Sequence, residues 1–504
     1  MQHDIKVEIK RLALRAIFRA ERRLEKNEEY QHRFTKRTGQ LASLSPTYKP
    51  VVHRHFDPVY CRRNANFLAK TIWKKVLDQT YEPNAAREFS IKKAGGGYRR
   101  LMEFSIPDAA LANVLLRRIR GRNLKKFSPQ SYAYHPDKNL FDAVLDMRGF
   151  IVPTEKIYSV QVDFKDFFES IPHAYIISLL NNSELINASV VERVAIERIM
   201  RHKYANEADY ISGKFSIRRR GTPQGSSISL ILANLALHNL DKDLEKTPSK
   251  FVRFADDVVA LTTNYQAAVD IESQFYRFSK ENGLTINRSK SPGINALSST
   301  DQEIRTINSL DYLGYCFNEN GLTLGDKSKV RIKRKVSKLI NIYLIEYIRD
   351  FSVGNYRYGP DFDWDLLGLI SELRRYMYGG LAEKDISEML NEGKRLKRVS
   401  GLMGFYCLLD DHQCLAELDG WLVNTVRRAM VERNKIILAK MGGSSVSPSN
   451  RELILGHWMS PERWRGPKKP DFRIPSFRRG ARAARKYYNI YGIEDVSPPK
   501  YHYS

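Results

Sequence analysis

The chain has 504 residues, of which 42% are hydrophobic and 28% charged. This composition is typical of globular proteins rather than disordered or membrane-embedded ones, and the length predicts several domains or subdomains. Lys and Arg outnumber Asp and Glu by 83 to 57, which gives a formal net charge of +26. A field of this size attracts polyanions and indicates nucleic-acid binding, the alternative being a merely soluble basic protein.

The sequence argues against three other classes of protein. No apolar run approaches the roughly 20 residues of a spanning helix, so no membrane partner is expected. The N-terminus is too often interrupted by charge to be a secretory signal. The cysteines form no Cys-x-x-Cys pair, which disfavours a disulfide scaffold or structural zinc and predicts a cytoplasmic location. They are Cys61, Cys316, Cys407 and Cys414.

The first half of the chain mixes helix and strand patterns. Residues 1–30 have the apolar spacing of an amphipathic helix with a basic outer face. "IKKAGGGYRRLMEFSIP" predicts two short strands joined by a glycine turn, followed by a helix from about Asp108 to Arg120. "IYSVQVDFKDFF" (157–168) predicts a buried strand that ends in a polar turn.

Further along, an apolar helix precedes the hairpin "FVRFADDVVAL" (251–261), in which we expect "ADD" to form the turn. A helix around 264–282 and the strand "LDYLGYCFN" follow. Residues 326–440 are helix-forming, and "MGGSSVSPSN" (441–450) is typical of a linker. A basic, aromatic-rich segment extends from Arg451 to Ser504.

Asp256 and Asp257 stand side by side between two apolar runs of that hairpin. Adjacent carboxylates repel unless a cation neutralises them, and oxygen ligands of this kind suit Mg²⁺. Taken alone, the pair is explained equally well as a turn exposed to water. Asp163 follows a second apolar run. A sheet that brings it beside Asp256 and Asp257 would hold two ions about 3.5–4 Å apart, as in-line phosphoryl displacement requires.

Several motifs occur in a specific order: "VDFKDFF", "RRGTPQGSSISLILAN", "FADD", "NGLTINRSKS" and "LDYLGYCF". Together they resemble reverse transcriptases of the bacterial, group II intron and retron type. The resemblance covers roughly residues 86–325 and, more loosely, a thumb to about 440. It implies an α+β, right-hand polymerase fold with fingers, a palm built on an antiparallel sheet, and a helical thumb.

The resemblance and the changes in composition together predict domain boundaries. These are a basic helical N-terminal extension (1–60), fingers (61–150), a palm (151–325) with a fingers insertion at about 175–215, a helical thumb (326–440), a linker (441–450) and a basic, Tyr-rich C-terminal tail (451–504).

The resemblance also assigns roles to single residues. Asp163, Asp256 and Asp257 would be catalytic and hold two Mg²⁺ ions, with Mn²⁺ as the alternative metal. Arg99 would contact the triphosphate, with Arg100 as the alternative residue. Lys93 would do the same, unless it is only a solvated charge in a loop. Phe168 would exclude ribonucleotides by its bulk, unless it only packs in the core. The dNTP-binding set is Lys93, Arg99, Phe164, Phe168, Gln224, Gly225 and Lys290, and the primer grip is Leu313, Gly314 and Tyr315.

By resemblance, the activity is RNA-directed DNA polymerisation from dNTPs on an RNA template, giving a DNA product. Phe254 stands where the family has Tyr, and no Cys/His endonuclease module follows the thumb. These features favour a domesticated enzyme of bacterial antiviral defence working with a dedicated noncoding RNA. The alternatives are a group II intron-type maturase or RNA-binding splicing cofactor, an RNA-dependent RNA polymerase, and a polymerase subunit without activity.

The C-terminal tail interleaves basic and aromatic residues, a pattern that suits single-stranded RNA. Contacts within a homo-oligomer are an alternative. A sharper hypothesis is protein priming from a tyrosine hydroxyl in a mobile terminus. The candidates are Tyr487, Tyr488, Tyr491, Tyr501 and Tyr503.

Overall fold

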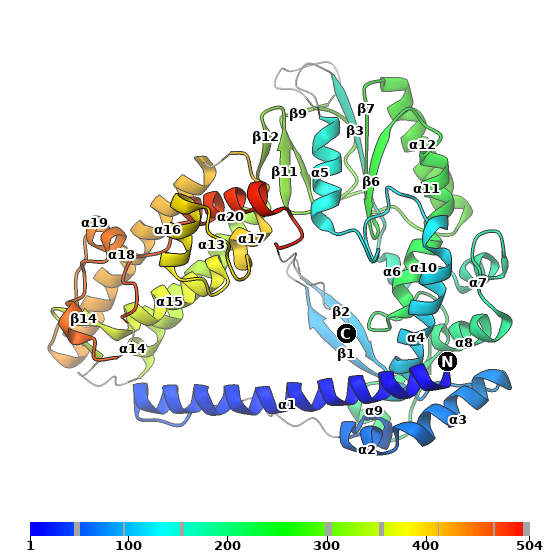
Figure 1. Ribbon diagram of the computed structural model, residues 1–504, viewed down its shortest axis with the longest axis horizontal. Coiled ribbons are helices and arrows are strands. Elements are labelled where there is room, and N and C mark those ends of the chain that lie inside the picture. Colours follow the sequence, from blue (N-terminus) through cyan, green and yellow to red (C-terminus); the bar gives the residue numbers. More distant parts are fainter. Residues whose placement is uncertain are drawn as a thin grey trace.

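The computed structural model describes residues 1–44, 51–93, 96–151, 156–297, 305–351, 357–411, 413–466 and 469–496. Helices and mainly antiparallel sheets occupy separate parts of the chain, and this confirms the predicted α+β class. In Figure 1 the palm lies at the upper right, the fingers at the lower right and the thumb at the left. This is the arrangement that the resemblance to polymerases implies.

The palm is built on a five-stranded sheet of order β6-β7-β3-β8-β9. Its central strand, β3 (Ile157–Asp163), is an almost continuously buried apolar run, as the sequence predicts. Helix α12 (Tyr265–Glu281) packs on the sheet through Ile271 and Phe275. The other elements are β6 (Lys250–Phe254), β7 (Asp257–Thr262), β8 (Gly293–Leu297), β9 (Thr306–Ile307), α5 (Leu140–Phe150), α6 (Phe167–Ser170), α10 (Ile228–Ala236) and α11 (His238–Leu244).

The β6–β7 hairpin has a tighter turn than the sequence predicts. Phe254 pairs with Asp257, so only Ala255 and Asp256 form the turn, and Asp257 is the first residue of β7. Ala255 adopts a positive φ of 63°, a conformation that costs a residue with a side chain about 1–2 kcal/mol. The two aspartates therefore occupy different structural positions.

The fingers contain a four-stranded sheet of order β2-β1-β4-β5. Strand β4 comes from the predicted insertion and pairs with β1 in parallel. Helix α4 begins at Ile106 because the Ser105 hydroxyl accepts from the Asp108 amide and caps it. The bounds are β1 (Ala86–Lys92), β2 (Tyr98–Glu103), β4 (Lys203–Ala205), β5 (Ser216–Ile217), α2 (Pro58–Arg63), α3 (Ala65–Leu77), α4 (Ile106–Asn123), α7 (His173–Asn181), α8 (Val190–Met200) and α9 (Glu207–Ile211), with 3-10 turns at Arg54–Phe56 and Leu124–Lys126.

A three-stranded sheet, β10-β11-β12, leads from the palm into the helical thumb. A π-helical segment, Asn341–Glu346, continues α13 into α14. The bounds are β10 (Leu310–Tyr312), β11 (Tyr315–Asn318), β12 (Gly321–Leu324), α13 (Asp326–Ile340), α14 (Tyr347–Asp350), β13 (Tyr358–Gly359), β14 (Phe362–Asp363), α15 (Trp364–Tyr378), α16 (Glu383–Glu392), α17 (Gly401–Phe405), α18 (Gln413–Met441) and α19 (Asn450–Leu455), with a 3-10 turn at Pro461–Arg463.

The C-terminal segment differs from the loose linker and mobile tail that the sequence suggests. Within 441–450, Ser445 is buried and donates to the Asp363 carboxylate (2.5 Å), and Val446 joins the core. Helix α20 (Phe477–Tyr491) buries Phe477, Ala481, Ala484 and Tyr487 in the thumb core. Small residues at helical spacing let α20 pack closely against α16 and α18. Tyr501 and Tyr503 lie outside the described residues.

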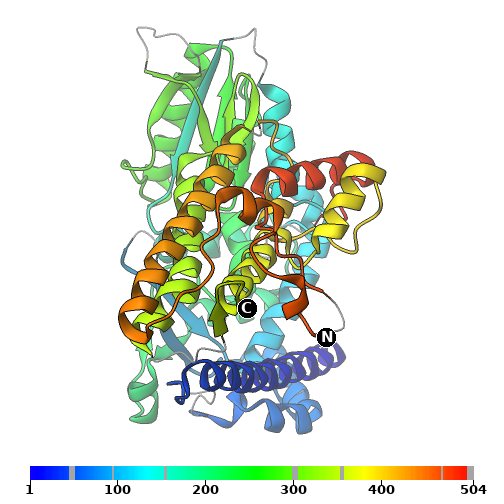
Figure 2. The same cartoon turned by 90° about the vertical axis from the view of Figure 1, so that its left-hand side faces the viewer.

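The N-terminal helix α1 (Gln2–Thr38) is longer than the predicted 1–30 and extends below the palm and the thumb, with α2 and α3 on its other side (Figures 1 and 2). Its first turns pack on the fingers through Ile5, Ile9 and Ala13. Its last turns reach the thumb, where Phe34 contacts Phe351. Among the described residues, no helix is both long and apolar enough to cross a membrane.

Candidate active site

A cavity of about 1070 Å³ lies between the fingers hairpin β1–β2 and the ends of the palm strands. Polar and charged side chains from five separate segments of the sequence line it. The predicted site residues that it gathers are Lys93, Arg99, Asp163, Phe164, Phe168, Gln224, Gly225, Asp256 and Lys290.

The sheet register brings the three predicted metal ligands together. Asp163, the last residue of β3, pairs with Asp257, the first residue of β7. Asp256 occupies the adjoining turn, and Asp163 and Asp256 both line the cavity. Asp257 is not among the lining residues. Two carboxylates, those of Asp163 and Asp256, therefore line the cavity directly, and the third, Asp257, lies next to them behind its wall.

Burial and mutual repulsion disturb the ionisation of this cluster. Burial, reinforced by the Asp163 charge, raises the pKa of Asp256. Burial and the charges of Asp256 and Asp163 raise the pKa of Asp257 to about 7. Each additional negative charge in this small volume is costly, and a cation at the cluster would relieve that cost.

Polar neighbours hold Asp163 in place. Its Oδ2 accepts from Asn287 Nδ2 (3.1 Å) and lies 3.3 Å from Lys290 Nζ. Its backbone amide donates to Ser291 Oγ (3.1 Å). These residues come from the "NGLTINRSKS" motif. The Lys290 side chain is 67% exposed, so this ammonium can leave the carboxylate without disturbing the fold.

The chemistry of the carboxylates fits divalent metal ions. Within the described ranges, no three or more His, Cys, Asp or Glu side chains form a ready-made metal cluster. Mg²⁺ does not require such a cage, because it commonly takes one or two carboxylates and completes its shell with substrate phosphates and water. Asp163 and Asp256 supply hard oxygen donors at the cavity, and burial together with the Asp163 charge, which raises the pKa of Asp256, disfavours its ionisation unless a cation is bound nearby.

A tight contact between the fingers and the "PQG" turn shapes the floor of the cavity. The Met102 amide donates to the Gln224 carbonyl oxygen (2.7 Å). Gly225 has φ +120°, and a Cβ built there would lie 2.2 Å from the Met102 carbonyl oxygen. Only glycine fits this position without displacing one of the two segments.

The two predicted aromatic contacts differ in accessibility. Phe168 is half-buried at the cavity wall, its ring edge-on to Phe167. Phe164 is only 2% exposed and packs with Phe167 and Phe278 in the core. Phe168 is therefore the aromatic side chain of this pair that can meet a ligand, while Phe164 supports the wall.

The fingers hairpin brings cationic side chains to the cavity. Lys93 and Arg99 are both exposed, and Lys93 Nζ lies 3.4 Å from the Asp166 carboxylate. Arg100 instead contacts Glu88 (3.6 Å) and Glu169 (3.9 Å). The palm thus contributes carboxylates to the cavity and the fingers contribute cations. Cationic side chains of this kind can bind the phosphates of a nucleotide.

Comparison with known proteins identifies this part of the chain. The family described as "Reverse transcriptase (RNA-dependent DNA polymerase)" matches residues 91–317. This range contains all three aspartates and both sides of the cavity. Residues 91–317 form a reverse transcriptase domain.

Curated relatives and solved structures share only part of their length with the chain. The "Uncharacterized 91 kDa protein in cob intron" of Schizosaccharomyces pombe is 31% identical over 180 residues, 36% of this chain and 21% of that protein. The "Group II intron-encoded protein LtrA" of Lactococcus lactis subsp. cremoris is 23% identical over 187 residues, covering 36% and 29%. A telomerase structure from Candida albicans, in complex with a fragment of telomeric RNA, covers 75% of this chain and 67% of that chain at 13% identity and a TM-score of 0.38.

The predicted primer grip of the reverse transcriptase domain is the β10–β11 turn. Leu313 and Gly314 form it, both at positive φ. The Tyr315 side chain is fully buried and donates to the Phe405 carbonyl oxygen in the thumb. Tyr315 therefore anchors the thumb to this turn, and Leu313 and Gly314 are the members at its tip.

Two residues that the sequence did not single out hold the β6–β7 turn that bears Asp256. Arg253 is fully buried and donates to Asp241 (Nε–Oδ1 2.7 Å, Nη2–Oδ2 2.5 Å) and to the Ala255 carbonyl oxygen (2.9 Å). The Tyr312 hydroxyl donates to the Asp257 carbonyl oxygen (3.0 Å). The signal for Arg253 was present as a charge within the apolar strand "FVRF".

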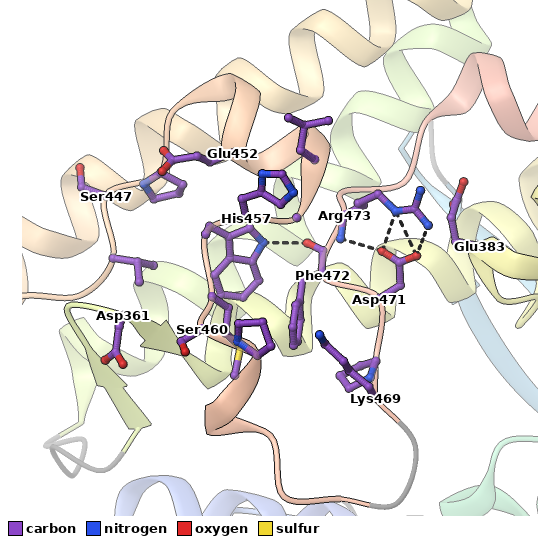
Figure 3. A pocket seen from close by; sticks show the side chains of 18 of the residues that line it. Asp361, Glu383, Ser447, Glu452, His457, Ser460, Lys469, Asp471, Phe472 and Arg473 are labelled. Carbon is purple, nitrogen blue, oxygen red and sulfur yellow. Dashed lines mark hydrogen bonds and ion pairs between the residues drawn. The ribbon is translucent and has the colours of Figure 1, made fainter.

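A second hollow of about 1100 Å³ lies on the thumb, far along the chain from the reverse transcriptase domain (Figure 3). Its charged residues already have partners within the protein. Arg473 pairs with Asp471, Arg463 with Asp361 and Arg479 with Glu383. Trp458 donates to the Phe472 carbonyl oxygen (2.7 Å). Its carboxylates therefore do not form a cluster of neighbouring acids like Asp163, Asp256 and Asp257 at the first cavity.

Proposed function

We propose that this protein is an RNA-directed DNA polymerase that adds dNTPs to a primer on an RNA template. One observation carries the proposal: a single cavity is lined by Asp163 and Asp256 of the palm, by Lys93 and Arg99 of the fingers, and by the Gln224–Gly225 turn. The match of residues 91–317 to reverse transcriptases supports the same activity.

In the proposed reaction, the primer 3′ oxygen attacks the α-phosphorus of the dNTP, the new O–P bond forms, and pyrophosphate leaves. Asp163 and Asp256, backed by Asp257, would hold two Mg²⁺ ions; Mn²⁺ is the alternative. When bound, such ions lower the pKa of the attacking hydroxyl and stabilise the leaving group. Lys93 and Arg99 bind the triphosphate. The half-buried Phe168 ring lies against the sugar and excludes a 2′-hydroxyl by its bulk.

The double substitution Asp256→Ala with Asp257→Ala tests the proposal. It removes two of the three clustered carboxylates while leaving the basic surface unchanged. We expect incorporation of labelled dNTPs on a primed RNA template to fall at least 1,000-fold, as general acid-base and electrostatic losses of this kind do. Affinity for the same RNA, measured by filter binding, should stay within about twofold, because no cationic contact is lost.

Asp270→Ala is the matched control, because this exposed aspartate lies on α12, where it accepts from Gln266 of the same helix (3.1 Å). It should leave incorporation unchanged. Incorporation that persists in the double variant would show that the carboxylate assignment is wrong.

The template and biological role rest on the resemblance. We propose a dedicated noncoding RNA as the template and antiviral defence as the role. All four cysteines are free and buried, which suits a cytoplasmic location. Sequencing the RNA and DNA that co-purify with the protein tests this: one abundant RNA with its complementary DNA is expected, and a mixture reflecting total cellular RNA would contradict it.

Protein priming is now confined to fewer candidates. Tyr487 is buried, and the Tyr491 hydroxyl donates to the Gly393 carbonyl oxygen (2.8 Å). Tyr488 is half-buried in the same helix. Priming is therefore proposed from Tyr488, Tyr501 or Tyr503. Mass spectrometry after nuclease digestion should find a nucleotide on a peptide that contains one of them, and the absence of a nucleotide from all of these peptides would exclude the idea.

A maturase or splicing cofactor is the second candidate, favoured by relatives whose names place them in introns. Splicing assays with an intron RNA from the neighbourhood of the gene separate the two functions. A maturase would accelerate splicing even with Asp256 and Asp257 replaced, whereas a dedicated polymerase would leave splicing unchanged.

A further inference from the structure

Helix α1 is anchored at both ends and bare in the middle. On the fingers, the buried Glu8 carboxylate lies 2.9 Å from Arg117 Nη1 and accepts from Asn113 of α4 (2.8 Å). On the thumb, Arg37 donates to Asp365 (2.5 Å) and stacks 4.0 Å above the Tyr347 ring. Between these anchors, residues 18–26 are exposed at every position, all round the helix.

The anchors make α1 the last link in a closed circuit of contacts. The fingers join the palm where Met102 bonds Gln224, and the palm joins the thumb where Tyr315 bonds Phe405. Helix α1 then connects the thumb back to the fingers, and it runs below the thumb in the two perpendicular views (Figures 1 and 2). A helix of this length spans about 55 Å, long enough for the bare stretch to cross between two separate bodies.

The bare stretch and the turn before it carry a row of arginines, with the exposed Arg22 and Lys26 beside it. Arg15, Arg19 and Arg23 follow one another at spacings of four and so form one line along the helix. Glu21 and Glu25 stand two places after Arg19 and Arg23, about half a turn away on the opposite side. Within the described part of the chain, the three arginines form no ion pair. A helix adapted only to solvent would instead interleave its charges so that they pair.

The arginine line faces the same way as the residues that meet the thumb. Tyr30 follows Arg23 by seven places, two helical turns, and Phe34 follows Tyr30 by four. Phe34 and Arg37 contact the thumb directly. The arginines therefore face toward the thumb, into the circuit, and not outward from the base of the molecule.

Grouping these charges costs stability. Partial burial and the charges of Arg15 and Arg23 lower the pKa of Arg19. Each like-charged pair at this spacing destabilises a helix by about 0.2–0.5 kcal/mol. A polyanion that lies along the line would reverse this cost and would suit a chain of net charge +26.

We propose that α1 is a nucleic-acid-binding strap: Arg15, Arg19 and Arg23 bind the phosphate backbone of the RNA–DNA duplex, and the two anchors close the protein around it. The choice of an RNA–DNA duplex rests on the proposed polymerase function. The phosphate contact itself rests only on the charge pattern and on the position of the helix.

The first experiment measures affinity of the full-length protein for a fluorescent RNA–DNA duplex across a salt series, without dNTPs. Arg15→Gln, Arg19→Gln and Arg23→Gln together should weaken binding at least 10-fold near 0.15 M salt. The slope of log affinity against log salt should become shallower by about 2–3, because each phosphate contact contributes about 0.9.

Two matched triple variants control this result. Lys70→Gln, Lys74→Gln and Lys75→Gln remove the same charge from exposed positions of α3 and should change affinity by less than twofold. Replacing the three arginines with lysine keeps the charge and should retain most of the affinity. Equal effects of the α1 and α3 glutamine variants would overturn the proposal. Equal losses in the lysine and glutamine variants of α1 would assign the effect to helix packing and would also overturn it.

A second experiment tests closure. Phe34→Ala with Arg37→Ala releases the thumb anchor but leaves the arginine line intact. We expect the duplex to dissociate at least 10-fold faster in the presence of excess competitor, with the circular dichroism spectrum retained. An unchanged dissociation rate would show that α1 does not enclose the duplex. Incorporation of dNTPs by the wild-type protein is measured separately, so failure of the polymerase assignment is distinguishable from failure of the strap.

Discussion

At the scale of single residues, Gly225 shows how closely strand β2 of the fingers approaches the turn at the floor of the cavity. Its φ of +120° strains any other residue, and a Cβ would lie 2.2 Å from the Met102 carbonyl oxygen. Because that oxygen belongs to the backbone, the clash cannot be relieved by moving a side chain. One of the two walls of the cavity must shift instead.

We predict that Gly225→Ala lowers dNTP incorporation at least 10-fold, because it displaces the turn that bears Gln224 from strand β2. A misplacement of about 1 Å is enough for losses of this size. Steady-state kinetics on a primed RNA template measures the effect.

Gly213→Ala is the matched control. Gly213 also has a positive φ (+73°), but a Cβ there meets nothing within 4 Å. The control should lose only about 1 kcal/mol of the free energy of unfolding, measured by thermal unfolding, and should keep full activity. Equal activity of the two variants would refute the close-approach argument.

At the scale of elements, the β6–β7 hairpin depends on a buried ion pair with α11. Burial raises the pKa of the Asp241 carboxyl, while the Arg253 guanidinium opposes that rise. Arg253 also donates to Asn234 (3.1 Å) and to the Ala255 carbonyl oxygen (2.9 Å), so it connects α10, α11 and the strained turn. The pair therefore contributes to stability and separately positions Asp256.

We predict that Arg253→Met destabilises the protein by about 3–5 kcal/mol, because it leaves the Asp241 carboxylate buried without a partner. The double variant Arg253→Met with Asp241→Leu should recover most of the free energy of unfolding, since an apolar pair suits the site. Denaturant titration measures both variants.

Activity should behave differently from stability in this pair of variants. The double variant still lacks a donor to the Ala255 carbonyl oxygen, so its rate of dNTP incorporation should stay at least 10-fold below that of the wild type. A double variant that recovers both stability and rate would show that Arg253 has no role in positioning the turn.

Some helices and strands could be predicted from their own residues, and others could not. Strand β3 and helix α12 follow the periodicity of their own residues, and both occur where the sequence predicts them. The turn of the β6–β7 hairpin is set by pairing of Phe254 with Asp257, which local residue preferences do not reveal. Helix α20 looks polar in sequence and becomes core only because α16 and α18 cover its narrow stripe of small residues.

At the scale of the whole molecule, the contact between α1 and the thumb converges on Asp365. This carboxylate is fully buried and bonded by Arg37, Arg357 and Arg433. Burial raises its pKa, but the Arg37, Arg433 and Arg357 charges outweigh burial and hold the pKa below its ordinary value. The distal anchor of α1 thus depends on one ionised group.

A pH dependence follows from the direction of this shift. A group with a lowered pKa in the folded state stabilises that state above its unfolded value, about 3.9 for Asp, and loses this contribution as the pH falls through the folded pKa. We predict that the thumb end of α1 stays protected at neutral pH and becomes labile below about pH 4. Hydrogen exchange of residues 27–38 at several pH values measures this.

Asp365→Asn should reproduce the lability at pH 7, because it leaves the Arg37 and Arg357 guanidinium groups without the carboxylate that they share. Asp350→Asn is the control, since that carboxylate pairs with Arg349 at the surface. Protection of residues 27–38 that is unchanged in Asp365→Asn would contradict this account.

The order of the carboxylate, glycine and cationic motifs along the chain was enough to predict the reverse transcriptase domain that contains them. Those features depend on residue type and local spacing, which can be read from the sequence directly. Four features could be seen only in the folded chain: Asp257 lies behind Asp256, Arg253 holds their turn, Tyr487 belongs to the core, and α1 joins the thumb to the fingers. Each of these depends on contacts between distant segments, whose free energy is set by the packing of the whole molecule and by no single stretch of sequence.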